Sequence, residues 1–81
     1  MKHEIKITPN YFEAVKKGIK PWEIRKNDRN YKVGDNIILK EYDLKLKKYT
    51  GRRISGWIEY ILEGGKYGLS QGFVIMTIKY T

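Results

Sequence analysis

Residues 18–25 read Gly-Ile-Lys-Pro-Trp-Glu-Ile-Arg and carry the strongest structural signal in this chain. Pro21 lacks a backbone N–H and cannot continue a helix, and apolar and polar side chains alternate after it. An alternation with a period of two predicts a strand. Glu23 and Arg25 would therefore lie together on the face opposite Trp22.

The residues before this segment predict a strand followed by a helix. Residues 2–7 alternate with the period of a half-buried strand. Thr8 followed by Pro9 is typical of an N-cap and a first helical position, and Gly18 suits the end of a helix. We expect a helix of about nine residues here.

The residues after the segment predict three more strands. Residues 36–42 form one strand, a long return strand starts at Tyr49, and residues 73–80 close the chain. Residues 45–48 suit a hairpin tip, and the glycines in 63–68 predict a loop.

These elements make one α+β domain over residues 1–81, with about five strands and one early helix. Gly51 and Gly56 suit bends in a curved sheet, so we expect a small, partly open β-barrel. Short helical turns are possible near Asp28 and Leu69. Tryptophan is more often a core residue than a stacking surface, so we expect Trp22 and Trp57 to be buried. That leaves the charged pair of the segment on a sheet surface.

The composition points to a polyanionic partner. Seventeen Lys and Arg against nine Asp and Glu give a net charge of +8, and such a field attracts nucleic acid. The alternative without a binding function is a solvated basic surface that keeps the protein soluble. The positive charges concentrate in two windows of the sequence: Lys16, Lys17, Lys20, Arg25, Lys26, Arg29 and Lys32, then Lys45, Lys47, Lys48, Arg52 and Arg53.

Several classes of protein are excluded or disfavoured. The chain has no cysteine and one histidine, which excludes disulfides, thiolate metal sites and multi-histidine zinc sites. We expect no metal and no cofactor. No apolar run approaches the roughly 18 residues of a membrane span, and the start lacks a signal peptide. We therefore expect a cytoplasmic protein without a membrane partner.

The spacing Gly18-x-Lys20-x-x-Glu23-x-Arg25 resembles the signature of ASCH domains, whose fold is the PUA-like β-barrel. Further segments are similar to a short bacterial and phage group of ASCH-like proteins, and they extend the resemblance over nearly the whole chain: residues 25–29, 33–35, 49–52 and 61–69. The resemblance implies a cleft beside the motif strand. It also implies a nucleic-acid ligand, RNA more than DNA, or a nucleotide-like ligand.

The same resemblance implies that Lys20, Glu23 and Arg25 line the cleft. Lys20 and Arg25 suit a phosphate or a base edge, and Glu23 suits an exocyclic amine or the orientation of Arg25. The structural alternative is an exposed ion pair that contributes no more than about 1 kcal/mol to the stability of the fold.

Other residues are candidate contacts for the ligand. Lys26, Asn27, Asp28 and Arg29 follow the motif strand, and of these Arg29 can both hold a phosphate and stack on a base. Asn and Asp are also ordinary turn residues.

Two aromatic side chains complete the candidate list. Tyr67 is a possible stacking surface in the glycine-rich loop, which lacks the pattern of a triphosphate-binding loop. His3 falls on the same side of its strand as Ile5 and Ile7. This position fits two interpretations: a buried, hydrogen-bonded histidine, or a ligand contact at the edge of the cleft.

Three alternative functions remain. Some ASCH relatives are small amidohydrolases of acylated nucleosides in which a lysine assists a threonine nucleophile. Here that threonine position holds Glu23, so Thr8 or Thr50 would have to replace it. A nuclease could use Glu23 as a base beside Lys20, in which case these two residues would be catalytic. A protein-interaction or regulatory module would show an exposed apolar patch.

Overall fold

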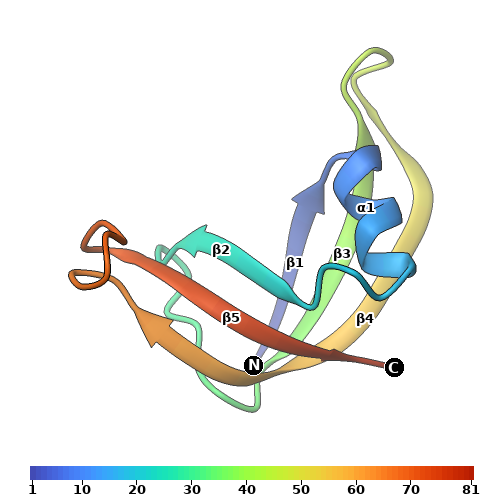
Figure 1. Cartoon of the computed structure of the whole chain (residues 1–81). Helices are drawn as coiled ribbons and strands as arrows, with labels where there is room; N and C mark the ends of the chain where they lie inside the picture. The colour runs from blue at the N-terminus through green and yellow to red at the C-terminus, as the bar shows by residue number, and fades with distance from the viewer.

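The computed structural model describes residues 1–81 and contains five strands and one helix. In chain order these are β1 (Lys2–Ile7), α1 (Pro9–Lys16), β2 (Trp22–Lys26), β3 (Asn36–Asp43), β4 (Lys48–Glu63) and β5 (Phe73–Tyr80). The strands form one sheet in the order β1-β3-β4-β5-β2. Figure 1 shows that this sheet curls into a half-barrel, with α1 beside β3 at one end.

The long strand β4 makes the curl possible because it belongs to both halves of the sheet. Its first part pairs antiparallel with β3 and its second part pairs antiparallel with β5. Gly56 takes part in both pairings and lies at the corner. A Cβ atom there would lie 2.4 Å from the Lys79 carbonyl oxygen of β5, so only glycine allows this close approach.

The core lies inside the curl and is closed at one end by α1. Thr8 has the extended N-cap conformation and Pro9 begins the helix, whose Phe12 and Val15 are buried. The two side chains pack with the inward-facing residues of every strand except β2 and with Tyr31 of the β2–β3 connection: Ile5, Ile7, Tyr31, Ile37, Leu39, Ile58, Val74, Met76 and Ile78.

The strands β1 and β2 are the two edges of the sheet, and side chains join them across the open side of the half-barrel. Nη2 of Arg25 donates to the Lys6 carbonyl oxygen at 2.8 Å. Nη1 of Arg29 donates to the Glu4 carbonyl oxygen at 2.8 Å. Two guanidinium groups thus cover backbone acceptors that an edge strand would otherwise leave to water or to another chain.

The sequence predicted the number and order of these elements correctly. The five strands, the early helix, the hairpin tip between β3 and β4 and the loop after β4 all lie within a few residues of their expected positions. The single helix has eight residues, and no helix is long and apolar enough to cross a membrane.

The helical turns considered near Asp28 and Leu69 are wrong. After β2, the Asn27 side-chain oxygen accepts the Tyr31 backbone N–H at 2.9 Å and Asn30 has a φ of 53°, which fixes an irregular loop. In the second segment Leu69 forms a small antiparallel bridge with Lys66. Local hydrogen bonds replace the helical pattern in both places.

The expected burial of the tryptophans is also wrong. Trp22 and Trp57 keep 45% and 39% of their surface exposed. In β2 the alternation is as predicted, but Glu23 is paired with the fully buried Met76 of β5. Paired residues of adjacent strands share a face, so Glu23 points into the half-barrel and Trp22 points out.

Candidate functional site

A pocket of about 370 Å³ lies at the seam between the edge strands β1 and β2. The end of β1, the start of α1 and the motif strand β2 all contribute to its wall. We call it the seam pocket, and its polar and aromatic lining includes Lys6, Thr8, Tyr11, Lys20, Trp22 and Glu23. Arg25 completes the wall beside Lys6. The volume falls within the range of about 300–1,000 Å³ that is usual for small-ligand sites.

A buried carboxylate lies in this wall. Glu23 is 3% exposed, yet both of its carboxylate oxygens have cationic partners. Lys20 Nζ donates to Oε1 at 2.5 Å, and Arg25 Nε donates to Oε2 at 3.1 Å. A buried charge is tolerated only when it is paired and hydrogen-bonded in this way. The contact is therefore a buried carboxylate bound by two cations, and not the exposed ion pair that the sequence analysis considered as the structural alternative.

The two cations keep hydrogen-bonding capacity for a ligand. The Lys20 ammonium has three donors and uses two of them, on Glu23 and on the Trp22 carbonyl oxygen at 3.0 Å. The Arg25 guanidinium has five donors, of which one binds Glu23 and one binds the Lys6 carbonyl. Each side chain is thus held in place by the fold while further N–H groups remain available.

Aromatic rings flank the cations at the entrance of the seam pocket. Trp22 and Tyr11 are 45% and 54% exposed. The Lys20 ammonium lies 4.8 Å from the ring centre of Trp22 and 5.7 Å from that of Tyr11. Such contacts restrict the position of the ammonium group. The exposed ring faces offer a planar ligand two surfaces on which to stack.

A partly buried tyrosine near this carboxylate has a hydroxyl without a hydrogen-bond partner. The Tyr80 OH is shielded from solvent and has no hydrogen-bond partner. Its burial, and after that the negative charge of Glu23, raise the pKa of Tyr80 well above its usual range. The inner side of the half-barrel thus has a polar region near Glu23, in addition to the buried polar residues His3, Asp35 and Glu41.

The structure brings together the three residues on which the sequence analysis placed most weight, namely Lys20, Glu23 and Arg25. The residues after them do not line the seam pocket. Lys26 and Asp28 continue along the surface, Asn27 binds the Tyr31 backbone, and Arg29 binds the β1 edge.

His3 and Tyr67 lie elsewhere. His3 is buried, and its Nε2 donates to Asp35 Oδ2 at 2.8 Å while its ring meets Tyr31 edge-on. The hydrogen bond from His3 is the main cause that lowers the pKa of Asp35, which is the structural role considered for this histidine. Tyr67 is exposed on the loop after β4.

Lys6, Thr8 and Tyr11 belong to the seam pocket, although the sequence analysis selected neither Lys6 nor Tyr11 and considered Thr8 only as a replacement nucleophile. They lie at the junction of β1 and α1, nine to fourteen residues before Lys20. The only signal in the sequence was that this junction precedes the motif strand. That order along the chain does not predict that the two edge strands of the sheet lie next to each other in the fold.

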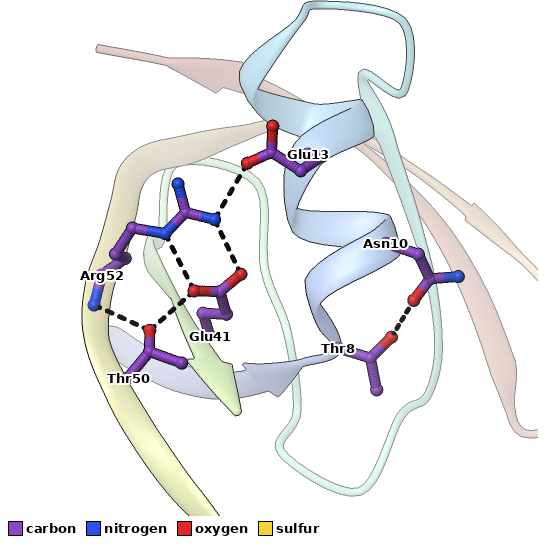
Figure 2. Close-up of polar contacts among 6 residues, drawn as sticks. All are labelled: Thr8, Asn10, Glu13, Glu41, Thr50 and Arg52. Carbon is purple, nitrogen blue, oxygen red and sulfur yellow. Dashed lines mark hydrogen bonds and ion pairs between the residues drawn. The ribbon is translucent and has the colours of Figure 1, made fainter. Parts of the chain in front are cut away.

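A second buried carboxylate holds the helix to the β3–β4 hairpin. Arg52 Nε and Nη2 donate to the two oxygens of Glu41 at 2.9 Å each, and Nη2 also contacts Glu13 of α1 (Figure 2). Thr50 Oγ1 donates to Glu41 Oε1 at 2.6 Å. The Arg52 and Thr50 hydrogen bonds lower the pKa of Glu41 to about 2. Arg52 Nε and Nη2 and the Thr50 hydroxyl all donate to carboxylates of the protein, and only Nη1 of Arg52 is left without a partner. The cluster therefore has a structural role.

Comparison with known proteins places the chain in a family. Residues 2–78 match the family described as "Domain of unknown function (DUF3850)". The chain belongs to this family. A relative from Escherichia phage P2, the "Uncharacterized 12.9 kDa protein in GpA 3'region", is 39% identical over 71 residues. The match covers 74% of this chain and 63% of the length of the phage protein.

In this DUF3850 chain the seam pocket can recognise a ligand by three kinds of contact. The free N–H groups of Lys20 and Arg25 suit an anionic group or a carbonyl oxygen. The remaining lone pairs of Glu23 suit an N–H donor. The rings of Trp22 and Tyr11 suit a flat, apolar surface. A nucleotide offers all three at once.

Proposed function

We propose that this protein is a nucleic-acid-binding module, with single-stranded RNA as its preferred ligand, and that it has the PUA-like fold of ASCH domains. The convergence of Lys20, Glu23 and Arg25 on one pocket carries the proposal. These are the charged positions of the motif that resembles the ASCH signature, and they come together at the seam beside two exposed rings.

The chemistry of the pocket supports a base or nucleotide as the bound unit. A base that is free of a duplex can stack on Trp22 or Tyr11 and present its hydrogen-bonding edge to Glu23. The phosphate beside it would lie near Lys20 or Arg25. Bases in a duplex are already stacked, so the pocket favours single strands, bulges or loops. The net charge of +8 adds a general attraction for the polymer.

Removing an exposed ring of the pocket tests this proposal without disturbing the core. We expect Trp22→Ala to weaken binding of single-stranded RNA by about 5- to 100-fold, because one stacked base is lost. Lys20→Gln should weaken binding as well and lower the salt dependence. Fluorescence anisotropy at about 50 and about 200 mM salt would measure both effects, since phosphate contacts weaken steeply over this range.

Tyr60→Ala is the matched control for this experiment. Tyr60 is an aromatic residue, 65% exposed, and it does not line the seam pocket. Its replacement should leave the affinity for RNA within a factor of about two, as expected of a surface residue outside the interface. Equal affinities for the parent, Trp22→Ala and Lys20→Gln would refute the assignment of the seam pocket as the binding site.

A second candidate function is hydrolysis of an acylated nucleoside, and the position of Thr8 favours it. Thr8 lines the seam pocket together with Lys20 and Glu23, whereas Thr50 is bound to Glu41 in the structural cluster. The Thr8 hydroxyl, however, donates to Asn10 Oδ1 at 2.7 Å, an amide oxygen that is not a base (Figure 2). Release of free carboxylate from acylated nucleosides by the parent, and none by Thr8→Val, would establish this activity.

A further inference from the structure

The outer face of β1, β3 and the first part of β4 combines positive charges with aromatic rings. Lys6 of β1 is paired with Lys40 of the adjacent strand β3, and Lys40 is paired with Arg53 of β4. Next to them Tyr42 is paired with Tyr49. Residues paired across strands share a face of the sheet. We call these five residues the outer basic face.

Direct contacts connect its charges to its rings. The Lys6 ammonium lies 4.1 Å from the ring centre of Tyr42, and the Lys40 ammonium lies 4.7 Å from that of Tyr49. The two tyrosine rings meet edge-to-face with their centres 5.1 Å apart. Tyr49 remains 47% exposed, so its ring has surface to offer a ligand.

A small hollow of about 160 Å³ lies beside Tyr49. It forms where the pairing of β3 and β4 shifts, since Glu41 alone lies opposite residues 50–52. Lys40, Arg52 and Arg53 contribute positive charge to its lining, which contains no carboxylate. Arg52 is engaged by Glu41 and Glu13, and Lys40 has an exposed pairing with Glu4, whereas Arg53 has no ion pair.

Lys6 connects this face to the seam pocket. Lys6 lines the seam pocket, where its carbonyl oxygen binds Arg25, while its ammonium group lies over the Tyr42 ring. The two regions are therefore contiguous around the edge formed by β1. A chain molecule that leaves the pocket at this edge meets Tyr42, then Tyr49, then the hollow.

The other outer face of the sheet has a different character. There β2, β5 and the second part of β4 expose Trp22, Ile24, Tyr60 and Phe73. This surface is mainly aromatic and apolar, and its two lysines, Lys26 paired with Phe73 and Lys79 paired with Trp57, are not paired with other cations. A polyanion is attracted to the face on which positive charge and rings occur together.

We propose that a single strand held by one nucleotide in the seam pocket continues across the outer basic face. One of its bases stacks on Tyr49, and one of its phosphates occupies the hollow between Lys40 and Arg53. This inference rests on the proposed function and adds that the ligand is a polymer of several nucleotides rather than a free nucleotide.

Comparison of a short RNA with a mononucleotide tests the inference. The probes are single-stranded oligouridylate and oligoadenylate of about eight nucleotides, within the footprint usual for small single-strand binders, together with UMP and AMP. We expect Tyr49→Ala to weaken binding of the oligomers by about 5- to 100-fold. It should leave binding of the mononucleotides unchanged, because the seam pocket is intact.

The charges of the face have their own measurable effect. Lys40→Gln and Arg53→Gln should each reduce the slope of log K against log salt by about 0.7 for a single strand. The matched controls are Tyr60→Ala on the other outer face and Lys66→Gln on the loop after β4. Neither control should change the oligomer affinity or its salt slope appreciably.

The outcomes distinguish the proposed path of the strand over the outer basic face from binding in the seam pocket alone. Oligomer binding that depends on Trp22 but not on Tyr49 would overturn the path and leave the proposed function standing. Equal losses for Tyr49→Ala and Tyr60→Ala would also overturn the path. Absence of binding of any probe by the parent protein would overturn both.

Discussion

Replacement of Gly56 by alanine is expected to destabilise the fold by about 3 kcal/mol or more, at the upper end of the range for overpacked positions. The added Cβ would lie 2.4 Å from the Lys79 carbonyl oxygen and 3.0 Å from the Tyr80 Cα. Both atoms belong to the backbone of β5, so no side-chain rotation relieves the clash. The strands β4 and β5 would have to separate at the corner of the sheet.

For a domain of this size such a loss corresponds to a fall in Tm of about 10–20 °C. Thermal unfolding followed by circular dichroism measures it. Ser55→Ala is the control, because Ser55 is the preceding residue on β4 and its exposed side chain makes no hydrogen bond. It should change the stability by no more than about 0.5 kcal/mol. A Gly56→Ala variant as stable as Ser55→Ala would contradict the described packing of the corner.

The second large effect concerns Glu41, whose pKa is lowered from 4.5 to about 2 by Arg52 and Thr50. Because the folded-state pKa lies below the unfolded value, this group contributes stability above pH 4.5 and loses it as the pH falls toward 2. A shift of 2.5 pH units sets an upper limit of about 3 kcal/mol. Arg52 is 45% exposed, so solvent screening reduces the expected value to about 2 kcal/mol.

Denaturant unfolding as a function of pH measures this contribution. Glu41→Gln should be less stable than the parent at pH 7, and the difference should shrink as the pH falls from about 4.5 to about 2. Glu59→Gln on β4 is the control, since Glu59 is exposed and has no ion pair. A difference between the parent and Glu41→Gln that stays constant over this pH range would show that the carboxylate charge is not stabilising.

The sequence predicted the elements of this fold because their signals are local. Alternation with a period of two marks β1 and β2, and the Thr8-Pro9 pair marks the start of α1. The signal that determines which face of β2 is buried is not local. Alternation separates Glu23 from Trp22, but only the pairing of β2 with β5 determines which of them is buried.

The candidate site was predictable in part for the same reason. Lys20, Glu23 and Arg25 lie within six residues, so β2 and the short segment before it bring them together. Lys6 and Tyr11 join them because β1 and β2 are the two edges of one curled sheet. That arrangement depends on parallel pairing of β1 with β3 and on the corner in β4, and both are long-range contacts.

The central claim is that the seam pocket binds single-stranded nucleic acid, and titration of isotope-labelled protein by NMR tests it most directly. With single-stranded RNA of about eight nucleotides, we predict progressive amide shift changes at residues 6–8, at Tyr11 and at residues 20–25. The indole N–H of Trp22 should move with them. Shift changes confined to the loop of residues 64–72, or none at RNA concentrations up to about 1 mM, where even non-specific binding saturates, would contradict the claim.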